Sequence, residues 1–354
     1  MATTFSSVPI IDLNPLKHAG SSNNLSAGDA LKLSHQFYDV FATTGFAYLT
    51  NSPLSFDHND VFDLGREFFS MSEEEKFRIA KKTFNPLNSN TYRGYFPTQP
   101  LSASDNLKEG FEQGPSHAVP PSIPSEKLNL AEPNTWPSEQ HFKSRAKLEQ
   151  LHSELQALSA QLLSLLAMSL DKPANFFDHY LADSLSTLRL LHYPPNDYDS
   201  ANRSSSTLDS FTDSIVSTDS LDNVKLSCTP HTDSGILTLL HQDSTGGLEV
   251  RNAAGAWVAA PYIPGSIVVN IGDLMAEVSG GRFVATMHRV RAPQVKSTGD
   301  SFGRFSVPFF FEPGERCVVR SVNDENGHGI LYGDHVRSKM RTWVEFKDDD
   351  DDDD

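Results

Sequence analysis

Residues 231–240 have the sequence HTDSGILTLL, in which a histidine and a carboxylate two positions apart stand directly before an apolar, strand-like run. Residues i and i+2 of an extended segment point to the same side. His231 and Asp233 therefore predict two ligands for one metal ion at a strand end. His288, in a second strand-like segment, is the candidate third ligand. Two histidines and one carboxylate form the facial donor set that binds non-haem Fe(II) and leaves coordination positions open.

The segment Arg304-Phe-Ser306 adds a candidate carboxylate anchor. Arg304 and Ser306 would lie on one face of a strand, where a guanidinium fork and a hydroxyl suit a carboxylate. A mononuclear zinc hydrolase also uses two histidines and one aspartate, but that alternative gives no reason for the arginine and serine. A metal beside a carboxylate anchor predicts an oxidation in which a 2-oxo acid and O2 share the metal.

Short strand-like segments separated by turn residues fill the second half of the chain. They are 187–193, 236–240, 248–251, 257–260, 266–271, 283–290 and 304–311. Many short strands at regular spacing are typical of an antiparallel double-sheet barrel. Helical patterns come mostly earlier, at 27–44, 61–71 and 137–168. We therefore expect the α+β class, a jelly roll with flanking helices that come mostly from the N-terminal half.

The organisation along the chain is expected to be a single domain with a tail. Residues 1–347 would form the domain, from an N-terminal helical and loop part at 1–185, a jelly-roll core at 186–315 and a C-terminal segment at 316–347. The run Asp348–Asp354 is expected to be a disordered acidic tail. The Ser/Asp/Thr-rich stretch 196–223 is interpreted as a surface insertion at the mouth of the site, a lid or an inert loop, of which the inert loop is favoured.

Composition excludes several classes of protein. The net charge of −17 argues against a nucleic-acid partner, which requires a basic surface. No apolar run reaches the roughly 18 residues that a membrane helix needs, and the N-terminus lacks the features of a signal peptide. Cys228 and Cys317 are expected to be free thiols in a reducing compartment. We expect a cytoplasmic protein that acts as a monomer.

Taken together, the motifs resemble the 2-oxoglutarate/Fe(II)-dependent dioxygenases of the isopenicillin N synthase type. Besides residues 231–240, the resemblance rests on six segments: VPIIDL at 8–13, GFAYLTN at 45–51, GGLEV at 246–250, VVNIGD at 268–273, HRV at 288–290 and RFS at 304–306. Three more are similar to the branch of fungal thymine 7-hydroxylase and bacterial ethylene-forming enzymes: YRGYF at 92–96, KEGFE at 108–112 and LRLLHYP at 188–194. The resemblance covers most of the chain.

The resemblance implies a double-stranded β-helix and an enzyme that uses Fe(II), 2-oxoglutarate and O2, with ascorbate as a reductant. Its reaction would be hydroxylation, desaturation or oxidative cyclisation at an unactivated C–H bond, in specialised metabolism, with release of succinate and CO2. Arg304 and Ser306 would hold the distal carboxylate of 2-oxoglutarate, and Tyr193 would add a hydroxyl. Leu191 stands where the plant branch has an asparagine.

The substrate is expected to be a small carboxylate or amino-acid derivative, with a heterocycle as the next choice. The candidate substrate contacts are Arg93, Tyr95, Arg189 and Phe309, each of which is about as well explained by a structural role. Two alternatives stay open for the function. One is a catalytically silent, ligand-binding member of the fold, and the other is a peptide or protein hydroxylase with a broad groove.

Overall fold

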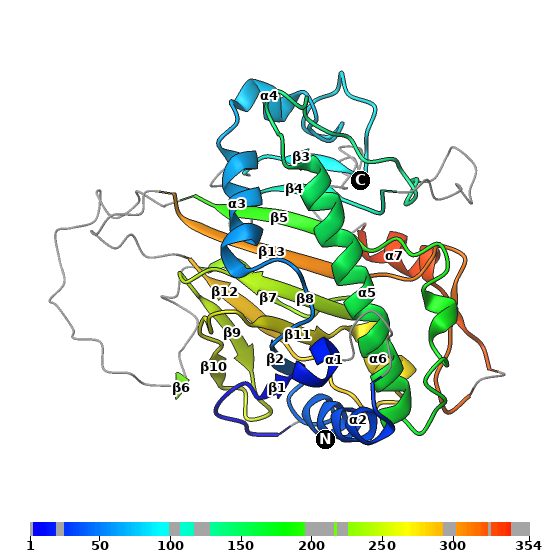
Figure 1. The fold of residues 1–354 in the computed structure, drawn as a ribbon. Helices are drawn as coiled ribbons and strands as arrows, with labels where there is room; N and C mark the ends of the chain where they lie inside the picture. Colours follow the sequence, from blue (N-terminus) through cyan, green and yellow to red (C-terminus); the bar gives the residue numbers. More distant parts are fainter. Residues whose placement is uncertain are drawn as a thin grey trace, which may run out of the picture.

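The computed structural model describes residues 3–18, 25–98, 107–116, 128–194, 216–217, 226–292, 302–324 and 327–340. Two main sheets lie at its centre, and long helices cover the larger of them (Figure 1). The acidic tail at 348–354 lies outside the described residues, and so does the insertion at 196–223 apart from residues 216–217.

The larger sheet has the strand order β1-β2-β11-β8-β13-β5-β4-β3, with β1 and β2 parallel and every other neighbouring pair antiparallel. In that order its strands are β1 (Ile10–Asp12), β2 (Phe46–Thr50), β11 (Ile267–Ile271), β8 (Leu237–Gln242), β13 (Arg304–Phe311), β5 (Thr187–Tyr193), β4 (Glu109–Gln113) and β3 (Gly94–Phe96).

The smaller sheet is antiparallel throughout and has the order β6-β10-β9-β12-β7. Its strands are β6 (Val216–Ser217), β10 (Trp257–Ala259), β9 (Leu248–Arg251), β12 (His288–Arg291) and β7 (Leu226–His231). Side chains from both sheets, such as Phe46 and Val268 of the larger and Leu248 and Val290 of the smaller, form one buried cluster. The two sheets therefore face each other across an apolar interior. A separate hairpin pairs β14 (Val318–Val319) with β15 (Ile330–Leu331).

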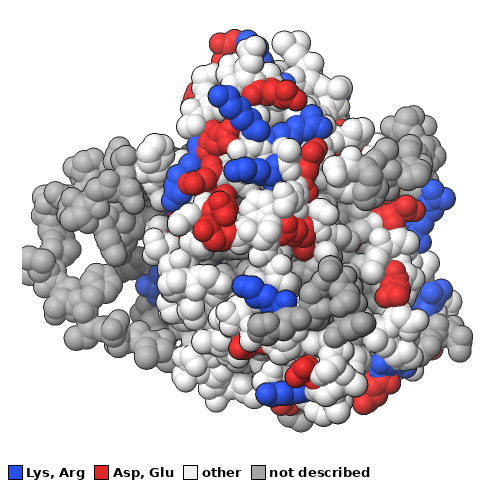
Figure 2. Space-filling model, in the orientation of Figure 1, with Lys and Arg blue, Asp and Glu red and all other residues white. Residues whose placement is uncertain are grey.

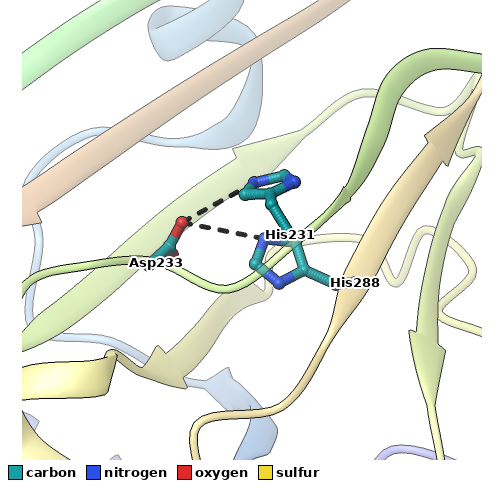
Figure 3. A group of neighbouring side chains, drawn as sticks. All are labelled: His231, Asp233 and His288. Carbon is teal, nitrogen blue, oxygen red and sulfur yellow. Dashed lines mark ion pairs between the residues drawn. The ribbon is translucent and has the colours of Figure 1, made fainter. Parts of the chain in front are cut away.

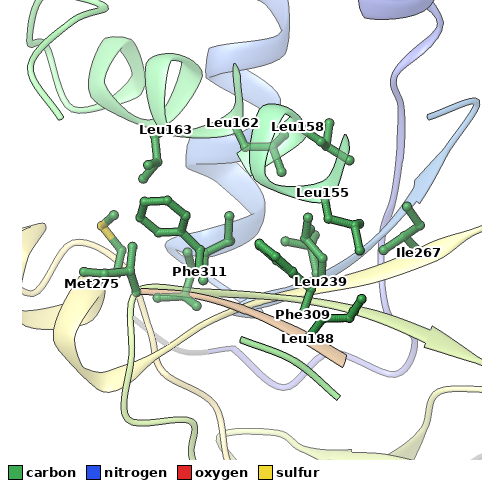
Figure 4. Packing of buried hydrophobic residues seen from close by; sticks show 14 of the residues in the cluster. Leu155, Leu158, Leu162, Leu163, Leu188, Leu239, Ile267, Met275, Phe309 and Phe311 are labelled. Carbon is green, nitrogen blue, oxygen red and sulfur yellow. The ribbon is translucent and has the colours of Figure 1, made fainter. Parts of the chain in front are cut away.

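Three helices cover the outer face of the larger sheet: α2 (Ala27–Phe41), α3 (His58–Phe69) and α5 (Arg145–Ser169). Leucines spaced along α5 pack onto side chains of the sheet, among them Leu239, Phe309 and Phe311 (Figure 4). Full burial of one leucine side chain stabilises a fold by about 1.5–3 kcal/mol. The shorter helices are α1 (Asn14–His18), α4 (Glu73–Phe77), η2 (Asp178–Tyr180), α6 (Asp273–Val278) and α7 (Tyr332–Met340).

Local sequence explains where these helices begin. The hydroxyls of Ser26 and Ser72 accept the N3 amide hydrogens of α2 and α4, and Asp57 forms a reciprocal capping box with Asp60 at the start of α3. Helix α2 ends near Gly45, whose φ of 72° lies in the left-handed region that glycine adopts at little cost. A Cβ there would stand 2.2 Å from the carbonyl oxygen of Val284.

The predicted helix at 137–168 begins eight residues late, at Arg145, because residues 137–144 form turns that bury Phe142 against Phe68 and Trp136. The predicted strand at 283–290 begins only at His288. The amide of Val284 donates to the Phe41 carbonyl at the end of α2 instead of to a neighbouring strand. Helix α7 was not predicted.

The coarse expectation of facing sheets flanked by helices is confirmed. No described helix is both long enough and apolar enough to cross a membrane. Cys228 and Cys317 are free thiols, as expected. Acidic and basic side chains are interspersed over the helix-covered face (Figure 2).

Candidate metal centre

His231 and His288 are cross-strand neighbours in the smaller sheet. His231 ends β7, His288 begins β12, and the two are direct ladder partners with ring centroids 4.2 Å apart. Asp233 lies in the loop that leaves β7 and crosses to β8 in the larger sheet. The expectation that Asp233 shares a strand face with His231 was therefore wrong, because the strand ends first. The predicted convergence of the three side chains is nevertheless present.

The Asp233 carboxylate has one oxygen turned toward both histidines and one turned away (Figure 3). Its Oδ1 lies 3.8 Å from Nε2 of His231 and 3.7 Å from Nε2 of His288. Its Oδ2 accepts hydrogen bonds from the hydroxyl of Thr238 (2.6 Å) and the side-chain amide of Asn270 (2.7 Å). These two residues are ladder partners on β8 and β11. The larger sheet thus orients the carboxylate toward histidines that the smaller sheet holds.

Backbone carbonyl oxygens fix the orientation of both imidazoles. Nδ1 of His231 lies 2.8 Å from the carbonyl oxygen of Thr229, and Nδ1 of His288 lies 3.2 Å from that of Thr286. A carbonyl oxygen only accepts, so each Nδ1 carries a hydrogen, and each Nε2 offers its lone pair to a metal ion when the ring is neutral. Two Nε2 lone pairs and one carboxylate oxygen converge within 4.8 Å, and this donor set fits Fe(II).

The electrostatics favour an ionised aspartate. Burial alone raises the pKa of Asp233, but the two histidines and the bonds from Asn270 and Thr238 outweigh burial and hold this pKa below its usual value. Burial lowers the pKa of His288. Burial also acts to lower the pKa of His231, but the Cys228 thiolate and the Asp233 carboxylate raise it to about 9. A ligand histidine must be neutral, so metal binding near neutral pH would displace a proton from His231.

The turn that carries Asp233 is fixed by two helices. The amides of Asp273 and Leu274, at the start of α6, donate to the carbonyls of Asp233 (2.7 Å) and Gly235 (3.1 Å). Nε2 of His335, on α7, lies 2.9 Å from the carbonyl oxygen of Ser234. Three consecutive carbonyls of the turn therefore have donors, which restricts the position of the metal-facing carboxylate.

The predicted anchor residues share the inner face of the larger sheet. Ser306 pairs with Gln242, and Phe310 pairs with Thr238, so strand alternation places Arg304, Ser306 and Thr238 on the same side. Arg304 is the ladder partner of Tyr193, and its guanidinium carbon lies 4.7 Å from the centre of the Tyr193 ring. The structure thus brings together all three residues assigned to the carboxylate.

Arg304 also has an unsatisfied donor. Its Nε donates to the carbonyl of Gly246 (2.7 Å), whereas Nη1 is buried with no hydrogen-bond partner among the described residues. A buried guanidinium nitrogen without an acceptor is costly. A ligand carboxylate would supply that acceptor, so the site fits 2-oxoglutarate.

Arg93 is fully buried and engaged in structural contacts. It donates to the Thr187 hydroxyl (2.6 Å) and the Leu185 carbonyl (3.1 Å). It also lines a cavity of about 220 Å³, together with Trp136 and Arg145, that includes none of the three metal-facing residues. We therefore interpret Arg93 as a structural residue.

Tyr95 and Phe309 do not reach the inner face. Both belong to the core between the larger sheet and its helices, and Phe309 contacts the ring of His152 on α5. The structure thus places them on the side of the sheet opposite Arg304 and Ser306. The expectation that they contact a substrate beside the metal is not supported by this geometry.

Arg189 does lie on the inner face. Its guanidinium carbon is 5.1 Å from the centre of the Phe310 ring, and Phe310 is the ladder partner of Thr238, which bonds to Asp233. The Nε of Arg189 lies 2.6 Å from Oε1 of Glu112, and 22% of the Arg189 side chain is exposed. Of the four candidate substrate contacts, Arg189 is the one with a described path of contacts to the metal centre.

Four contributors to the site were not predicted: Thr238, Asn270, the carbonyl of Gly246 and His335. The sequence contained a signal for Thr238 and Asn270, because each is a polar residue inside an otherwise apolar strand, where side chains point alternately to the two faces of the sheet. The carbonyl and the histidine left no such signal, because their contacts join segments far apart in the chain.

Comparison with known proteins agrees with this geometry. The model of the 2OG-Fe(II) oxygenase superfamily matches residues 186–313, and that of the non-haem dioxygenase in morphine synthesis N-terminal region matches residues 8–139. The chain is 28% identical to an isopenicillin N synthase of Streptomyces griseus, over 95% of each protein. It is 31% identical to a 2-oxoglutarate-Fe(II) type oxidoreductase of Aspergillus fumigatus, over 81% of this chain and 79% of that protein.

A solved structure is similar over nearly the whole chain. It is that of a full-length Neurospora crassa protein in complex with alpha-KG and thymine, with a TM-score of 0.70 and 25% sequence identity. The match covers 94% of this chain and 96% of that one.

Proposed function

The chain belongs to the 2OG-Fe(II) oxygenase superfamily and is a 2-oxoglutarate-dependent dioxygenase that uses Fe(II), 2-oxoglutarate and O2, and on this premise we propose that it oxidises an unactivated C–H bond of a small anionic molecule. We assign the facing sheets to the double-stranded β-helix. The observation that carries the site assignment is the position of Asp233 Oδ1, which faces Nε2 of both His231 and His288 while Oδ2 is engaged elsewhere.

We assign His231, Asp233 and His288 as the iron ligands. Three protein ligands leave coordination positions for the co-substrate and O2. When bound, iron and 2-oxoglutarate together activate O2 as the co-substrate is converted to succinate and CO2. The chain's own contribution is to hold the ligands in place: Thr238 and Asn270 orient the carboxylate, and two backbone carbonyls orient the imidazoles.

Arg304, Ser306 and Tyr193 are assigned to the distal carboxylate of 2-oxoglutarate. The support is the buried Nη1 of Arg304, which has no described acceptor, and the inner-face location of Ser306. A bidentate guanidinium–carboxylate contact would satisfy this nitrogen. It would also set the direction from which the co-substrate reaches the metal.

Arg189 is assigned to an anionic group of the substrate. Its partner Glu112 is fully buried and also pairs with Lys81 (2.5 Å), and the charge of Arg93 acts on the same carboxylate. This cluster also includes the carboxyl group of Glu312, and Arg189 is its partly exposed cation, so Arg189 is the member that an incoming anion can reach. Phe310 contacts Arg189 and is the ladder partner of Thr238, so a substrate anchored at Arg189 would present a C–H bond near the iron.

The oxidation would be a hydroxylation, a desaturation or an oxidative cyclisation in specialised metabolism. A neutral heterocycle is the runner-up substrate class, since the structurally similar Neurospora crassa protein was solved with thymine. An arginine can donate to ring carbonyls as well as to a carboxylate. The two classes differ in how strongly they depend on the charge of Arg189.

The test measures succinate release with a panel of small carboxylates and neutral heterocycles. Arg189→Gln should keep the slow, substrate-independent turnover of 2-oxoglutarate. It should raise the KM of the stimulating carboxylate by about 10- to 100-fold, because a charge-assisted hydrogen bond contributes about 1.5–3 kcal/mol. Arg145→Gln, at the first residue of α5 and away from the three metal-facing residues, is the matched control. Stimulation by neutral heterocycles alone would refute the anionic substrate class.

A further inference from the structure

His192 occupies a defined place beside Arg304. It is the ladder partner of Phe305, one residue along β5 from Tyr193, so its side chain points to the helix-covered face opposite Arg304. The imidazole is stacked against Phe305 (ring centroids 4.8 Å apart, planes at 20°) and also contacts Phe69 of α3, with centroids 5.2 Å apart. The ring is therefore held at a fixed position between a helix and the start of β13.

Both ring nitrogens of His192 face acceptors. Nδ1 lies 2.7 Å from Oε1 of Glu109, and Nε2 contacts the carbonyl oxygen of Phe302. Burial alone raises the pKa of Glu109, but hydrogen bonds from His192, Lys76 and Tyr95 outweigh burial and keep the pKa below its usual value. Glu109 is therefore an ionised acceptor. A carbonyl oxygen only accepts, so Nε2 of His192 is the donor in the contact with Phe302.

The contact with Phe302 matters because the chain turns at the next residue. Gly303 has φ of 88°, in the left-handed region, and it links Phe302 directly to Arg304. Phe302 is 60% exposed, so the packing of its side chain does little to fix the peptide between Phe302 and Gly303. The direction in which Arg304 leaves this turn therefore depends on what holds the Phe302 carbonyl.

The other sides of Arg304 are already fixed. After it, the amide of Phe305 donates to Oδ2 of Asp243 (2.5 Å). Its own side chain donates from Nε to the carbonyl of Gly246 (2.7 Å). His192 supplies the constraint on the N-terminal side, and it is anchored in turn by Glu109, which Lys76 binds at 2.7 Å.

We propose that His192 is a positioning residue for 2-oxoglutarate binding: by donating to the Phe302 carbonyl, it fixes the turn at Gly303 and aims the guanidinium of Arg304 at the co-substrate. The proposal rests on the assignment of Arg304 to the 2-oxoglutarate carboxylate. It also gives Tyr95 a role, because the Tyr95 hydroxyl donates to the Glu109 carboxylate that orients His192.

The test is an anaerobic titration of 2-oxoglutarate into the Fe(II)-loaded protein, monitored by its visible charge-transfer band. His192→Phe keeps an aromatic ring against Phe305 and removes both ring nitrogens, including the donor to the Phe302 carbonyl. It should raise the Kd of 2-oxoglutarate about tenfold and leave the Kd of Fe(II) unchanged. His192→Gln restores a donor that can reach the carbonyl and should recover part of the affinity. In turnover assays the KM for 2-oxoglutarate should rise in His192→Phe while kcat at saturation is retained.

Two further variants separate the possible failures. His141→Phe removes another histidine that pairs with a glutamate, Glu75, on the surface (3.0 Å), and it should bind 2-oxoglutarate like the parent. Arg304→Gln should lose most of the affinity. If Arg304→Gln binds like the parent, the anchor assignment is wrong and the role of His192 with it.

Other outcomes bear on His192 alone. If Arg304→Gln weakens binding but His192→Phe does not, the positioning role is refuted and the anchor stands. Equal losses of Fe(II) and 2-oxoglutarate affinity in both His192 variants would indicate a general structural role and would also overturn the proposal. Should His192→Phe not fold, His192→Leu carries the same prediction.

Discussion

Thr238→Val isolates the support of the proposed iron ligand Asp233. The substitution preserves the shape of the side chain but deletes the hydroxyl that donates to Oδ2 of Asp233 at 2.6 Å. The second donor, the amide of Asn270 at 2.7 Å, remains. The carboxylate therefore keeps one of its two described side-chain supports and should still bind metal, in a less fixed orientation.

The structure allows the size of the effect to be estimated. A hydrogen bond to a charged acceptor contributes about 1.5–3 kcal/mol, and about 1.4 kcal/mol corresponds to a tenfold change in affinity. The Kd of Fe(II) should therefore rise about 10- to 100-fold, the range typical of outer-shell partners of metal ligands.

The assay is an anaerobic Fe(II) titration in competition with a coloured chelator, accompanied by urea unfolding of the metal-free protein. The matched control is Thr43→Val, which deletes a hydroxyl that donates to a backbone carbonyl at the end of α2 (2.6 Å). Its Fe(II) affinity should equal that of the parent. Parent-like affinity in Thr238→Val as well would refute the argument that Thr238 orients a metal ligand.

Two further predictions concern stability. Burial lowers the pKa of His241 to about 4, so as pH falls from 6.5 to 4 the unfolded chain takes up a proton that the folded protein excludes. The resulting loss of stability, on the order of 3 kcal/mol, should be seen in urea unfolding across that range and should be absent from His241→Leu. Gly114→Ala should destabilise by about 1–3 kcal/mol, because its Cβ would lie 2.6 Å from Nη2 of Arg93. In the same unfolding assay Gly28→Ala, with 3.9 Å to its nearest atom, should be neutral or stabilising, and equal effects of the two would contradict the steric argument.

The strands of the fold were predictable where an apolar run ends at turn residues. The segments 187–193, 248–251 and 304–311 have in the structure the bounds that the pattern predicts. Helix α7 was not predictable in this way, because its short sequence is mostly polar and contains Gly333. Its role in bonding to the Ser234 carbonyl depends on tertiary packing that the local pattern does not encode.

For the site, residue type and spacing predicted that His231, Asp233 and His288 converge. They did not predict that Asp233 would lie in the loop after β7 and not in the strand itself. The geometry does not support the predicted contact between Phe309 and a substrate. Phe309 is buried in the core beneath the helices, on the face of β13 turned away from the metal, where it contacts His152 of α5.

Contacts between residues that lie far apart in the sequence could not be predicted. Asn270 was visible as a polar residue in an apolar strand, but its bond to Asp233 requires β8 and β11 to be neighbours. Strand order is set by long-range pairing, which one sequence does not reveal.

The most direct test of the metal centre and its anchor is an anaerobic absorption spectrum of the metal-free protein after addition of Fe(II) and 2-oxoglutarate, with Asp233→Ala beside it. The assignment predicts a visible charge-transfer band in the parent and none in the variant. A folded parent that binds Fe(II) without the band, or the same band in Asp233→Ala, would contradict it.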